Sequence, residues 1–170
     1  MSTDDAAGAH LVDAHDAHDA MLRRAIVLAA ESRAAGDHPF GALLCVGGDV
    51  IAEARNLVNT TLDITAHAET VLVRILEERG QLGLLAEGIV YASCEPCPMC
   101  VGALFWAGAR HVVFGMSAAK LGEVSTGPGE LLMGFTVTAA EIGSQAVPAM
   151  RVDGPLMEAD AVLGHHGYWF

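Results

Sequence analysis

The order of apolar and polar positions predicts a helix followed by a β-hairpin in the first third of the chain. Apolar residues recur at helical spacing up to Ala34, and residues 1–15 are expected to form a flexible tail. Short apolar runs at 42–46 and 50–54 follow, separated by the turn-forming sequence Gly47-Gly48-Asp49. Two apolar runs joined by such a turn are typical of a β-hairpin.

The middle of the chain alternates helix and strand signals. Thr65 precedes an apolar-periodic stretch that ends at Gly80, which predicts a helix with Thr65 as its N-cap. Apolar runs at 88–93 and 110–114 enclose a segment that opens with Pro98, and proline is best tolerated in the first turn of a helix. Strand, helix and strand in this order predict a parallel βαβ unit with a right-handed crossover.

The pattern weakens beyond Gly115. Short helices are expected at 117–122, 139–142 and 155–163, and an edge strand at 145–152. Neither an internal repeat nor a composition change typical of a linker interrupts the 170 residues. We therefore expect a single domain.

Charge restricts the expected partners. The chain holds 21 acidic residues against nine basic ones, for a formal net charge of −12. Nucleic-acid binding draws most of its affinity from Lys and Arg, so a small neutral substrate is favoured over tRNA or DNA. An acidic N-terminus, four cysteines and no apolar run of about 20 residues favour a cytoplasmic protein without a membrane span.

Two short segments carry the candidate chemistry. The first contains His67 and Glu69, and the second is Pro96-Cys97-Pro98-Met99-Cys100. One imidazole and two thiolates supply the three protein ligands that a catalytic zinc needs, with a fourth position left for water. H-x-E followed by P-C-x-x-C is the signature of zinc-dependent nucleobase deaminases.

Each residue of this signature has a distinct expected role. His67, Cys97 and Cys100 are the candidate zinc ligands, and the N-terminus of the predicted helix favours the thiolate form of both cysteines. Glu69 is the candidate proton carrier, which moves protons from water to a ring nitrogen and to the departing amine. A C-x-x-C sequence alone is also a redox motif, but that interpretation leaves His67 and Glu69 without a role.

Two other features allow more than one interpretation. The Asp-Ala-His repeat that includes His15 and His18 fits a metal site or, more simply, a polar helix start whose acids face the positive end of the helix dipole. Trp106 follows Cys100 on the predicted helix, where it fits either core packing or a wall of the substrate pocket.

With these motifs the chain resembles the cytidine deaminase superfamily over about residues 20–120. Within it, the chain is most similar to the bacterial guanine and nucleobase deaminase branch, with the tRNA adenosine deaminases as neighbours. The resemblance implies an α/β protein with a three-layer α/β/α fold and a five-stranded mixed sheet. It also implies one zinc ion per subunit and a homodimer in which the C-terminal segments are exchanged.

The resemblance further implies how a base is bound. Asn56 and the backbone at Ala68 would hydrogen-bond the base, and Phe40 would pack on its ring. An acid in the loop after the strand at 110–114 would act as a second catalytic group. The sequence offers Glu130 for this role, with Glu123 as the alternative. Within residues 160–170, an aromatic C-terminus would close over the pocket. Its residues are Tyr168, Trp169 and Phe170.

Three functions follow from these expectations. The first is hydrolytic deamination of a free base or related ring, whether a guanine-like purine, a cytosine-like base or a triazine. The second is adenosine-to-inosine editing of tRNA, which needs a basic surface for the RNA. The third is a zinc-stabilised binding protein without catalysis, and the retention of Glu69 argues against it because a structural site has no use for that carboxylate.

Overall fold

The structure is a computed structural model that describes residues 4–127 and 134–170, apart from the side chains of residues 4–17. Five strands form one sheet: β1 (Gly41–Val46), β2 (Asp49–Arg55), β3 (Ile89–Cys94), β4 (His111–Met116) and β5 (Arg151–Asp153). The helices are α1 (Asp4–Ala34), α2 (Val58–Thr61), α3 (Ala68–Glu78), α4 (Pro98–Ala107), α5 (Ala118–Ser125), α6 (Ala139–Gln145) and α7 (Glu158–Ala161). Two 3-10 helices add η1 (Leu82–Ala86) and η2 (Val162–His165).

The sheet is mixed, with the strand order β2-β1-β3-β4-β5. Strand β1 runs antiparallel to both β2 and β3, whereas β3, β4 and β5 are parallel to one another. The predicted hairpin and the predicted βαβ unit are both confirmed, the latter as β3-α4-β4. The prediction of an α/β fold with a five-stranded mixed sheet is confirmed as well.

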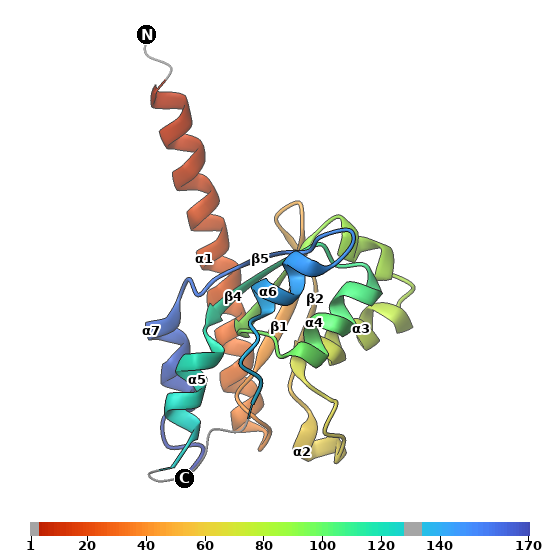
Figure 1. Ribbon diagram of the computed structural model, residues 1–170, viewed down its shortest axis with the longest axis vertical. Helices are drawn as coiled ribbons and strands as arrows, with labels where there is room; N and C mark the ends of the chain where they lie inside the picture. The colour runs from red at the N-terminus through yellow and green to blue at the C-terminus, as the bar shows by residue number, and fades with distance from the viewer. Residues whose placement is uncertain (1–3, 128–133) are drawn as a thin grey trace.

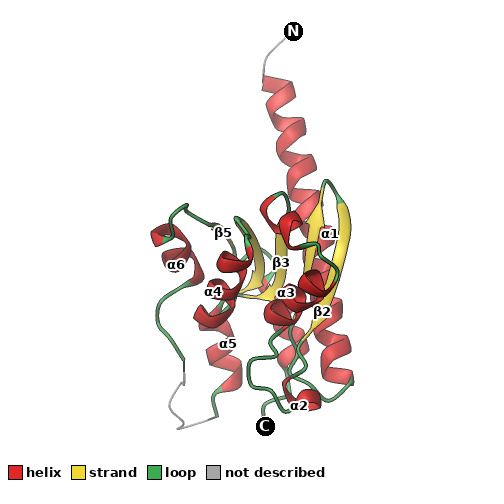
Figure 2. Ribbon diagram, turned by 90° about the vertical axis from the view of Figure 1, so that its right-hand side faces the viewer, coloured by secondary structure: helices red, strands yellow, loops and turns green. Residues whose placement is uncertain are grey.

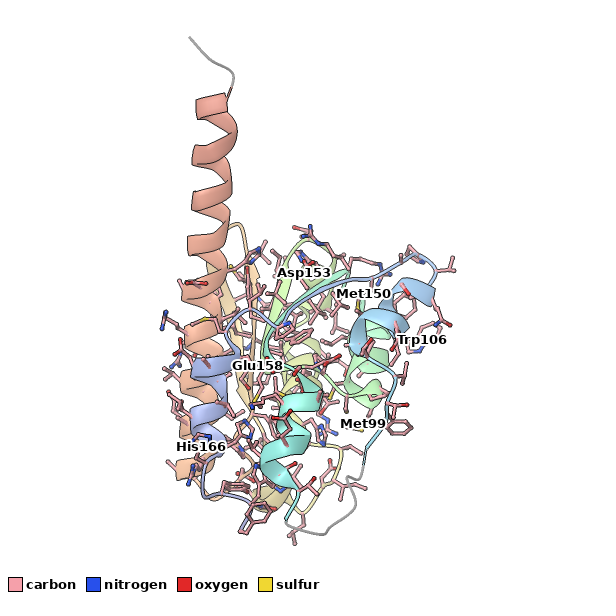
Figure 3. All side chains as sticks on the ribbon, turned by 60° about the vertical axis from the view of Figure 1, so that its left-hand side comes forward. Met99, Trp106, Met150, Asp153, Glu158 and His166 are labelled. Carbon is pink, nitrogen blue, oxygen red and sulfur yellow. The ribbon has the colours of Figure 1, made fainter. Side chains whose placement is uncertain are left out.

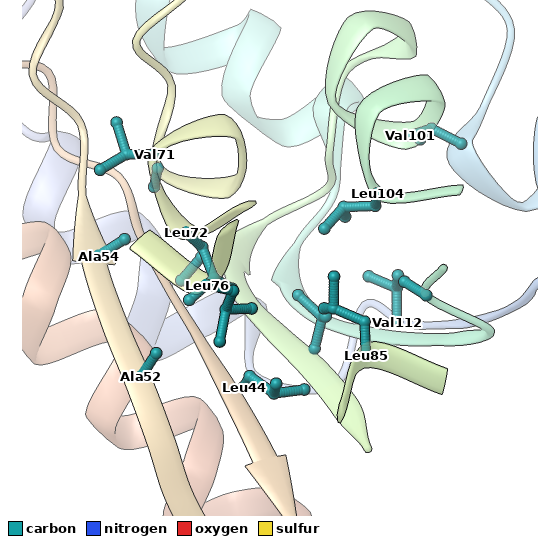
Figure 4. Packing of buried hydrophobic residues seen from close by; sticks show 14 of the residues in the cluster. Leu44, Ala52, Ala54, Val71, Leu72, Leu76, Leu85, Val101, Leu104 and Val112 are labelled. Carbon is teal, nitrogen blue, oxygen red and sulfur yellow. The ribbon is translucent and has the colours of Figure 1, made fainter. Parts of the chain in front are cut away.

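Helices cover both faces of the sheet (Figures 1 and 2). On one face, Leu43, Tyr91 and Val113 pack against Leu22 and Leu28 of α1. Successive side chains of a strand point to opposite faces, so the residues between them face the other layer. There the larger core cluster joins strand residues to α3 and α4 (Figure 4). Its labelled members include Leu44, Leu72, Leu76, Leu104 and Val112.

Helix α1 begins earlier than the sequence predicts. It starts at Asp4 and its first half extends beyond the rest of the chain in Figure 1, whereas the flexibility expected for residues 1–15 stays a prediction. The segment is rich in alanine, which has the highest helix propensity of all residues. The second half of α1 buries Leu22, Ala25 and Leu28 against the sheet.

Close packing between α1 and β1 depends on Gly41. A Cβ atom at this position would lie 2.7 Å from the backbone nitrogen of Ala29, which is closer than real side chains come. The Gly41 amide also donates a hydrogen bond to Ser93 Oγ (3.1 Å). Because Phe40 directly precedes Gly41, this close packing also fixes the position of the Phe40 backbone at the end of β1.

Several predicted boundaries differ from the structure. The N-cap of α3 is His67, not Thr65, because the Thr65 hydroxyl bonds to Asp63 and Arg74 instead of capping the helix. The segment after β2 contains the short helix α2, which the sequence pattern does not predict. The edge strand predicted over residues 145–152 is limited to the three residues of β5, because α6 extends to Gln145.

Candidate active site

Two helix N-termini meet at the candidate metal site. His67 is the N-cap of α3 and Cys97 is the N-cap of α4, with Pro98 at the first position of that helix. The two caps have nearly the same extended backbone, with φ and ψ of −68° and 158° at His67 and −67° and 165° at Cys97. The positive ends of two helix dipoles therefore converge here, which stabilises thiolates and the negative charge of a carboxylate.

Three potential ligand atoms converge at this point. His67 Nδ1 lies 3.7 Å from Cys97 Sγ and 3.5 Å from Cys100 Sγ. All three ligand atoms lie within 4.8 Å of one another. Tetrahedral zinc with ordinary Zn–N and Zn–S bonds separates nitrogen from sulfur by about 3.6 Å. The donor set and its spacing therefore fit a zinc ion with three protein ligands.

The two thiols of this group differ in their acidity. The pKa of Cys97 is lowered to about 4, mainly because its sulfur accepts a hydrogen bond from Cys100, with His67 adding to the effect. The pKa of Cys100 is raised, because its thiol donates to Cys97 and is buried. The two pKa shifts are opposite in direction because the two sulfurs share a hydrogen bond. A divalent cation replaces the thiol proton when it binds, because zinc is coordinated by thiolates.

Glu69 lies in the first turn of α3 and is 7% exposed. Burial raises the pKa of its carboxyl group, opposed by hydrogen bonds with its own backbone N–H and with the Cys100 thiol. The carboxyl group therefore neighbours the sulfur of a candidate ligand without belonging to the group of three. A carboxyl group with a raised pKa, next to a metal site, can both accept and return a proton.

Phe40 and Asn56 are held together beside this group. The backbone N–H of Asn56 donates to the Phe40 carbonyl (3.0 Å). The backbone N–H of Leu57 donates to the carbonyl of Ala66, next to His67. Asn56 is 1% exposed. Its Oδ1 accepts from the Val58 N–H (3.0 Å). Its Nδ2 is buried without a hydrogen-bond partner among the described residues.

The C-terminal segment folds back over Phe40 of its own chain. The Trp169 ring lies 6.2 Å from the Phe40 ring and 5.5 Å from the His38 ring. Arg33 fastens the segment by donating to the carbonyls of Gly164 and His166.

His165 belongs to the same aromatic cluster, although the sequence singled out only the last three residues. Its ring is stacked on Trp169 (6.0 Å between centroids, 17° between planes) and lies 5.2 Å from the Phe40 ring. It is 2% exposed, and burial lowers its pKa to about 4. Nothing in the sequence separates His165 from its neighbour His166, because burial of only one of them depends on the tertiary fold.

Unpaired polar atoms gather around Phe40. Among the residues that the structure describes, four buried side-chain nitrogen or oxygen atoms have no hydrogen-bond partner. Three of them are Asn56 Nδ2, His165 Nδ1 and Trp169 Nε1, and all three residues contact Phe40. Because buried polar groups are normally paired, such a cluster is typical of a site that hydrogen-bonds a polar ligand.

Comparison with known proteins agrees with this geometry. The model of the cytidine and deoxycytidylate deaminase zinc-binding region matches residues 15–116, more than half of the chain. The chain belongs to this deaminase family. Its zinc-binding domain holds the group of His67, Cys97 and Cys100, and the family acts on C–N bonds.

Relatives of the deaminase act on different substrates. It is 36% identical to a probable cytosine deaminase of Schizosaccharomyces pombe over 151 residues, which cover 88% of this chain and 91% of the relative. It is 44% identical to a guanine deaminase of Bacillus subtilis over 98 residues, or 57% of this chain and 63% of the relative. The crystal structure of a Bacillus subtilis guanine deaminase has a TM-score of 0.59 at 35% identity, covering 75% of this chain and 89% of that one.

A structure from a study of A-to-I editing by tRNA:A34 deaminases is also similar to the deaminase. Its TM-score is 0.67 at 28% identity, with 86% of this chain and 99% of that chain covered. The similarity extends across free-base and tRNA enzymes, so the family alone leaves the substrate open.

Trp106 lies on the surface of this chain and not beside the metal site. Trp106 is 85% exposed (Figure 3). It lines a groove of about 390 Å³ between α4 and α6, where Val137 and Ile142 also lie. Trp106 lies six positions after Cys100. An α-helix turns by roughly 240° net and rises by about 9 Å over that distance. The exposure of its side chain shows that Trp106 is not part of the core of this chain, and its role as a wall of the substrate pocket stays a prediction.

Other predicted residues are less closely associated with the site. Glu123 lies on α5, where it forms a salt bridge with Lys120 (2.7 Å), and Glu130 lies outside the described residues. Ala68 is fully buried as the first residue of α3, where backbone N–H groups have no partner within the helix. Phe170 is 72% exposed. Across the described ranges 4–127 and 134–170, none of the helices has the length and apolar character of a membrane span.

Proposed function

We propose that this deaminase removes the exocyclic amine of a free nucleobase or a related amino-heterocycle by hydrolysis, releasing ammonia. The observation that carries the proposal is the convergence of His67, Cys97 and Cys100 beside the buried carboxyl group of Glu69. A structural zinc site has four protein ligands, whereas three ligands leave a position for water.

In this proposal, His67, Cys97 and Cys100 hold the zinc ion, and Glu69 moves protons. Bound zinc supplies Lewis-acid activation of water near neutral pH. Glu69 accepts a proton from the attacking water and transfers it to the ring nitrogen next to the reacting carbon. It then passes the second proton of the water to the amine, which leaves as ammonia while the ring gains a carbonyl oxygen. The raised pKa of Glu69 supports this role, because the group must carry a proton in mid-reaction.

The substrate pocket of this proposal is the region around Phe40. Phe40 and Trp169 offer aromatic rings for a flat heterocycle, and Asn56 offers an unpaired amide N–H for a polar edge of that ring. The N–H of Ala68 at the start of α3 is a second donor. Tyr168 contacts Trp169 (4.8 Å) and the Arg33 guanidinium (5.8 Å). Its proposed role is to keep the C-terminal aromatic segment packed over Phe40.

The intramolecular bonds of the Lys and Arg side chains support a free base as the substrate over tRNA. All nine Lys and Arg residues lie within the described ranges, and each one donates a hydrogen bond or forms an ion pair inside the chain. Arg24, for example, makes two bonds of 2.6 Å to Glu53. Phosphate binding depends on basic side chains that can face the backbone of the nucleic acid. This observation favours an uncharged substrate.

Two further predictions belong to this proposal. Exchange of C-terminal segments in a homodimer stays a prediction, as does a cytoplasmic location. In the single chain, Trp169 packs on Phe40 of the same chain.

Ammonia release from a panel of compounds tests the proposal. The zinc-loaded protein is incubated with cytosine, guanine, an amino-triazine, the corresponding nucleosides and a tRNA with adenosine at position 34, and Glu69→Gln is the control for background. We expect release from at least one free base and none from the tRNA. Activity confined to the tRNA, or no release from any compound, would overturn the proposal.

A further inference from the structure

A carboxylate within the cysteine segment bonds to two other helices. Glu95 stands between Cys94 at the end of β3 and Pro96-Cys97. Its Oε2 accepts a hydrogen bond from the Ala118 N–H (2.9 Å), and its Oε1 accepts one from the Ala139 N–H (2.8 Å). Its own N–H donates to the Met116 carbonyl at the end of β4 (2.7 Å). One residue thus connects β3, β4, α5 and α6.

The two helix ends bound by Glu95 are the N-termini of two successive helices. Ala118 is the first residue of α5 and Ala139 is the first residue of α6. The first N–H groups of a helix have no partner within it, and a carboxylate there is also favoured by the helix dipole. Glu95 therefore satisfies a terminal donor of each helix and sets the distance between their starting points.

Helix α5 forms part of the packing around the proposed substrate pocket. Its residues Leu121 and Val124 pack on a cluster that contains Cys94 and Val162, and Phe40 contacts the same cluster. A shift of the α5 N-terminus would therefore move the packing behind the Phe40 ring. Small displacements of positioning groups can cost an enzyme about 100-fold in rate, because reacting groups must be aligned.

We propose that Glu95 is a positioning residue for the deamination reaction. Its carboxylate connects the zinc-ligand segment to the first turns of α5 and α6 by hydrogen bonds. These bonds fix the distance between the metal ligands and the packing around Phe40. The inference rests on the proposed function for its kinetic part, whereas its structural part is independent of the substrate. Glu95 touches neither the substrate nor the metal ligands in this role.

Two variants of Glu95 and one matched control test this proposal in the zinc-loaded protein. Glu95→Ala removes both acceptors and Glu95→Gln keeps only one oxygen acceptor. The control is Glu141→Ala, which also removes a carboxylate from the first turn of α6, where Glu141 bonds to Thr138 but not to the cysteine segment. The measurements are zinc content, kcat and KM on the best base, the thermal midpoint, and amide hydrogen exchange at Ala118 and Ala139.

We expect Glu95→Ala to keep its zinc and to lose about 10- to 100-fold in kcat/KM, mainly through a higher KM. Glu95→Gln should fall between Glu95→Ala and the wild type. Exchange should rise at both amides in Glu95→Ala, and Glu141→Ala should lose thermal stability while changing kcat/KM less than about twofold.

Three results would overturn the proposal: equal kinetic losses in Glu95→Ala and Glu141→Ala, loss of zinc in proportion to activity, or unchanged exchange at both amides. If the wild-type protein acts on no compound in the panel, the proposed function fails. The exchange measurement then still decides whether Glu95 connects the two helices.

Discussion

The two halves of the proposed active site are built in different ways. The metal half is made by the first turns of α3 and α4, and its four chemical groups lie between His67 and Cys100 in the sequence. The substrate half brings Phe40 and Asn56 together with His165 and Trp169 from the end of the chain. The first half combines the first turns of two helices and carries a sequence motif, whereas the second joins widely separated segments without one.

This difference suggests how the halves tolerate change. A metal ligand has one permitted distance and one permitted direction, so substitution of a ligand abolishes its function. Aromatic packing has broader geometry and is worth a modest free energy for each ring pair. We therefore expect effects to decrease from the metal half to the C-terminal segment, as the following predictions state.

The largest effect is expected from Cys100→Ser. Removing one sulfur leaves His67 and Cys97 as the remaining ligands, and a neutral hydroxyl is a much weaker ligand for zinc than a thiolate. We expect zinc content well below one ion per chain, and ammonia release at background level. Metal analysis after dialysis measures the zinc content, and the panel of bases measures the ammonia release. The control Cys45→Ser changes a cysteine in β1 outside the metal group and should keep its zinc. A fully loaded, active Cys100→Ser protein would contradict the ligand assignment.

A smaller loss is expected from Glu69→Gln, because the side chain moves protons without holding metal. We predict full zinc content and a fall in kcat of about 10²- to 10⁴-fold, the usual contribution of a general acid–base group. Zinc analysis and steady-state kinetics on the same sample measure both quantities. Loss of the metal in this variant would show that the carboxylate supports the ligands instead.

The two tryptophans provide a matched comparison between the pocket and the surface. Trp169→Ala removes a ring next to Phe40 and should raise KM roughly 3- to 10-fold, with a smaller effect on kcat. Trp106→Ala removes an exposed ring two turns beyond the metal ligands and should leave both constants nearly unchanged. Steady-state kinetics on the two proteins decide the point. Equal effects would remove the distinction between the pocket half and the rest of the surface.

The smallest effect is expected from the titration of His165. Burial lowers its pKa in the folded protein to about 4, whereas an unfolded histidine titrates near its ordinary value of 6.5. Below pH 6.5 the unfolded state therefore binds a proton that the folded state excludes, so stability is lost as the pH falls toward 4. His165→Phe should remove this contribution while keeping an aromatic ring beside Phe40 and Trp169.

Thermal unfolding at several pH values measures this difference. Between pH 8 and pH 5, the thermal midpoint should fall by a few degrees more in the wild type than in His165→Phe. His166→Phe, which changes the exposed neighbouring histidine, is the control and should follow the wild type. Parallel curves for all three proteins would contradict the burial of a neutral His165 in the folded state.

The sequence by itself determined the strands, the βαβ unit and the metal group. Strand alternation and the placement of Pro98 are local properties, and the spacing of His67, Glu69, Cys97 and Cys100 carries its chemistry without reference to the rest of the chain. The cap of α3 was predicted wrongly because the Thr65 hydroxyl has other partners close by. The Thr65 backbone N–H and hydroxyl both donate to the Asp63 carboxylate, and these bonds replace the bond that a capping threonine would make to the helix.

Only the tertiary structure decided which residues surround the proposed substrate pocket. It turned Trp106 to the surface, buried His165 but not His166, and brought Glu95 between two helix N-termini. These outcomes depend on contacts between segments far apart in the sequence, and no periodicity within a single segment encodes them. The metal half could be recognised from the sequence because its residue types and spacings form a motif, whereas the pocket half could not because its residues carry no such motif and meet only after the chain has folded.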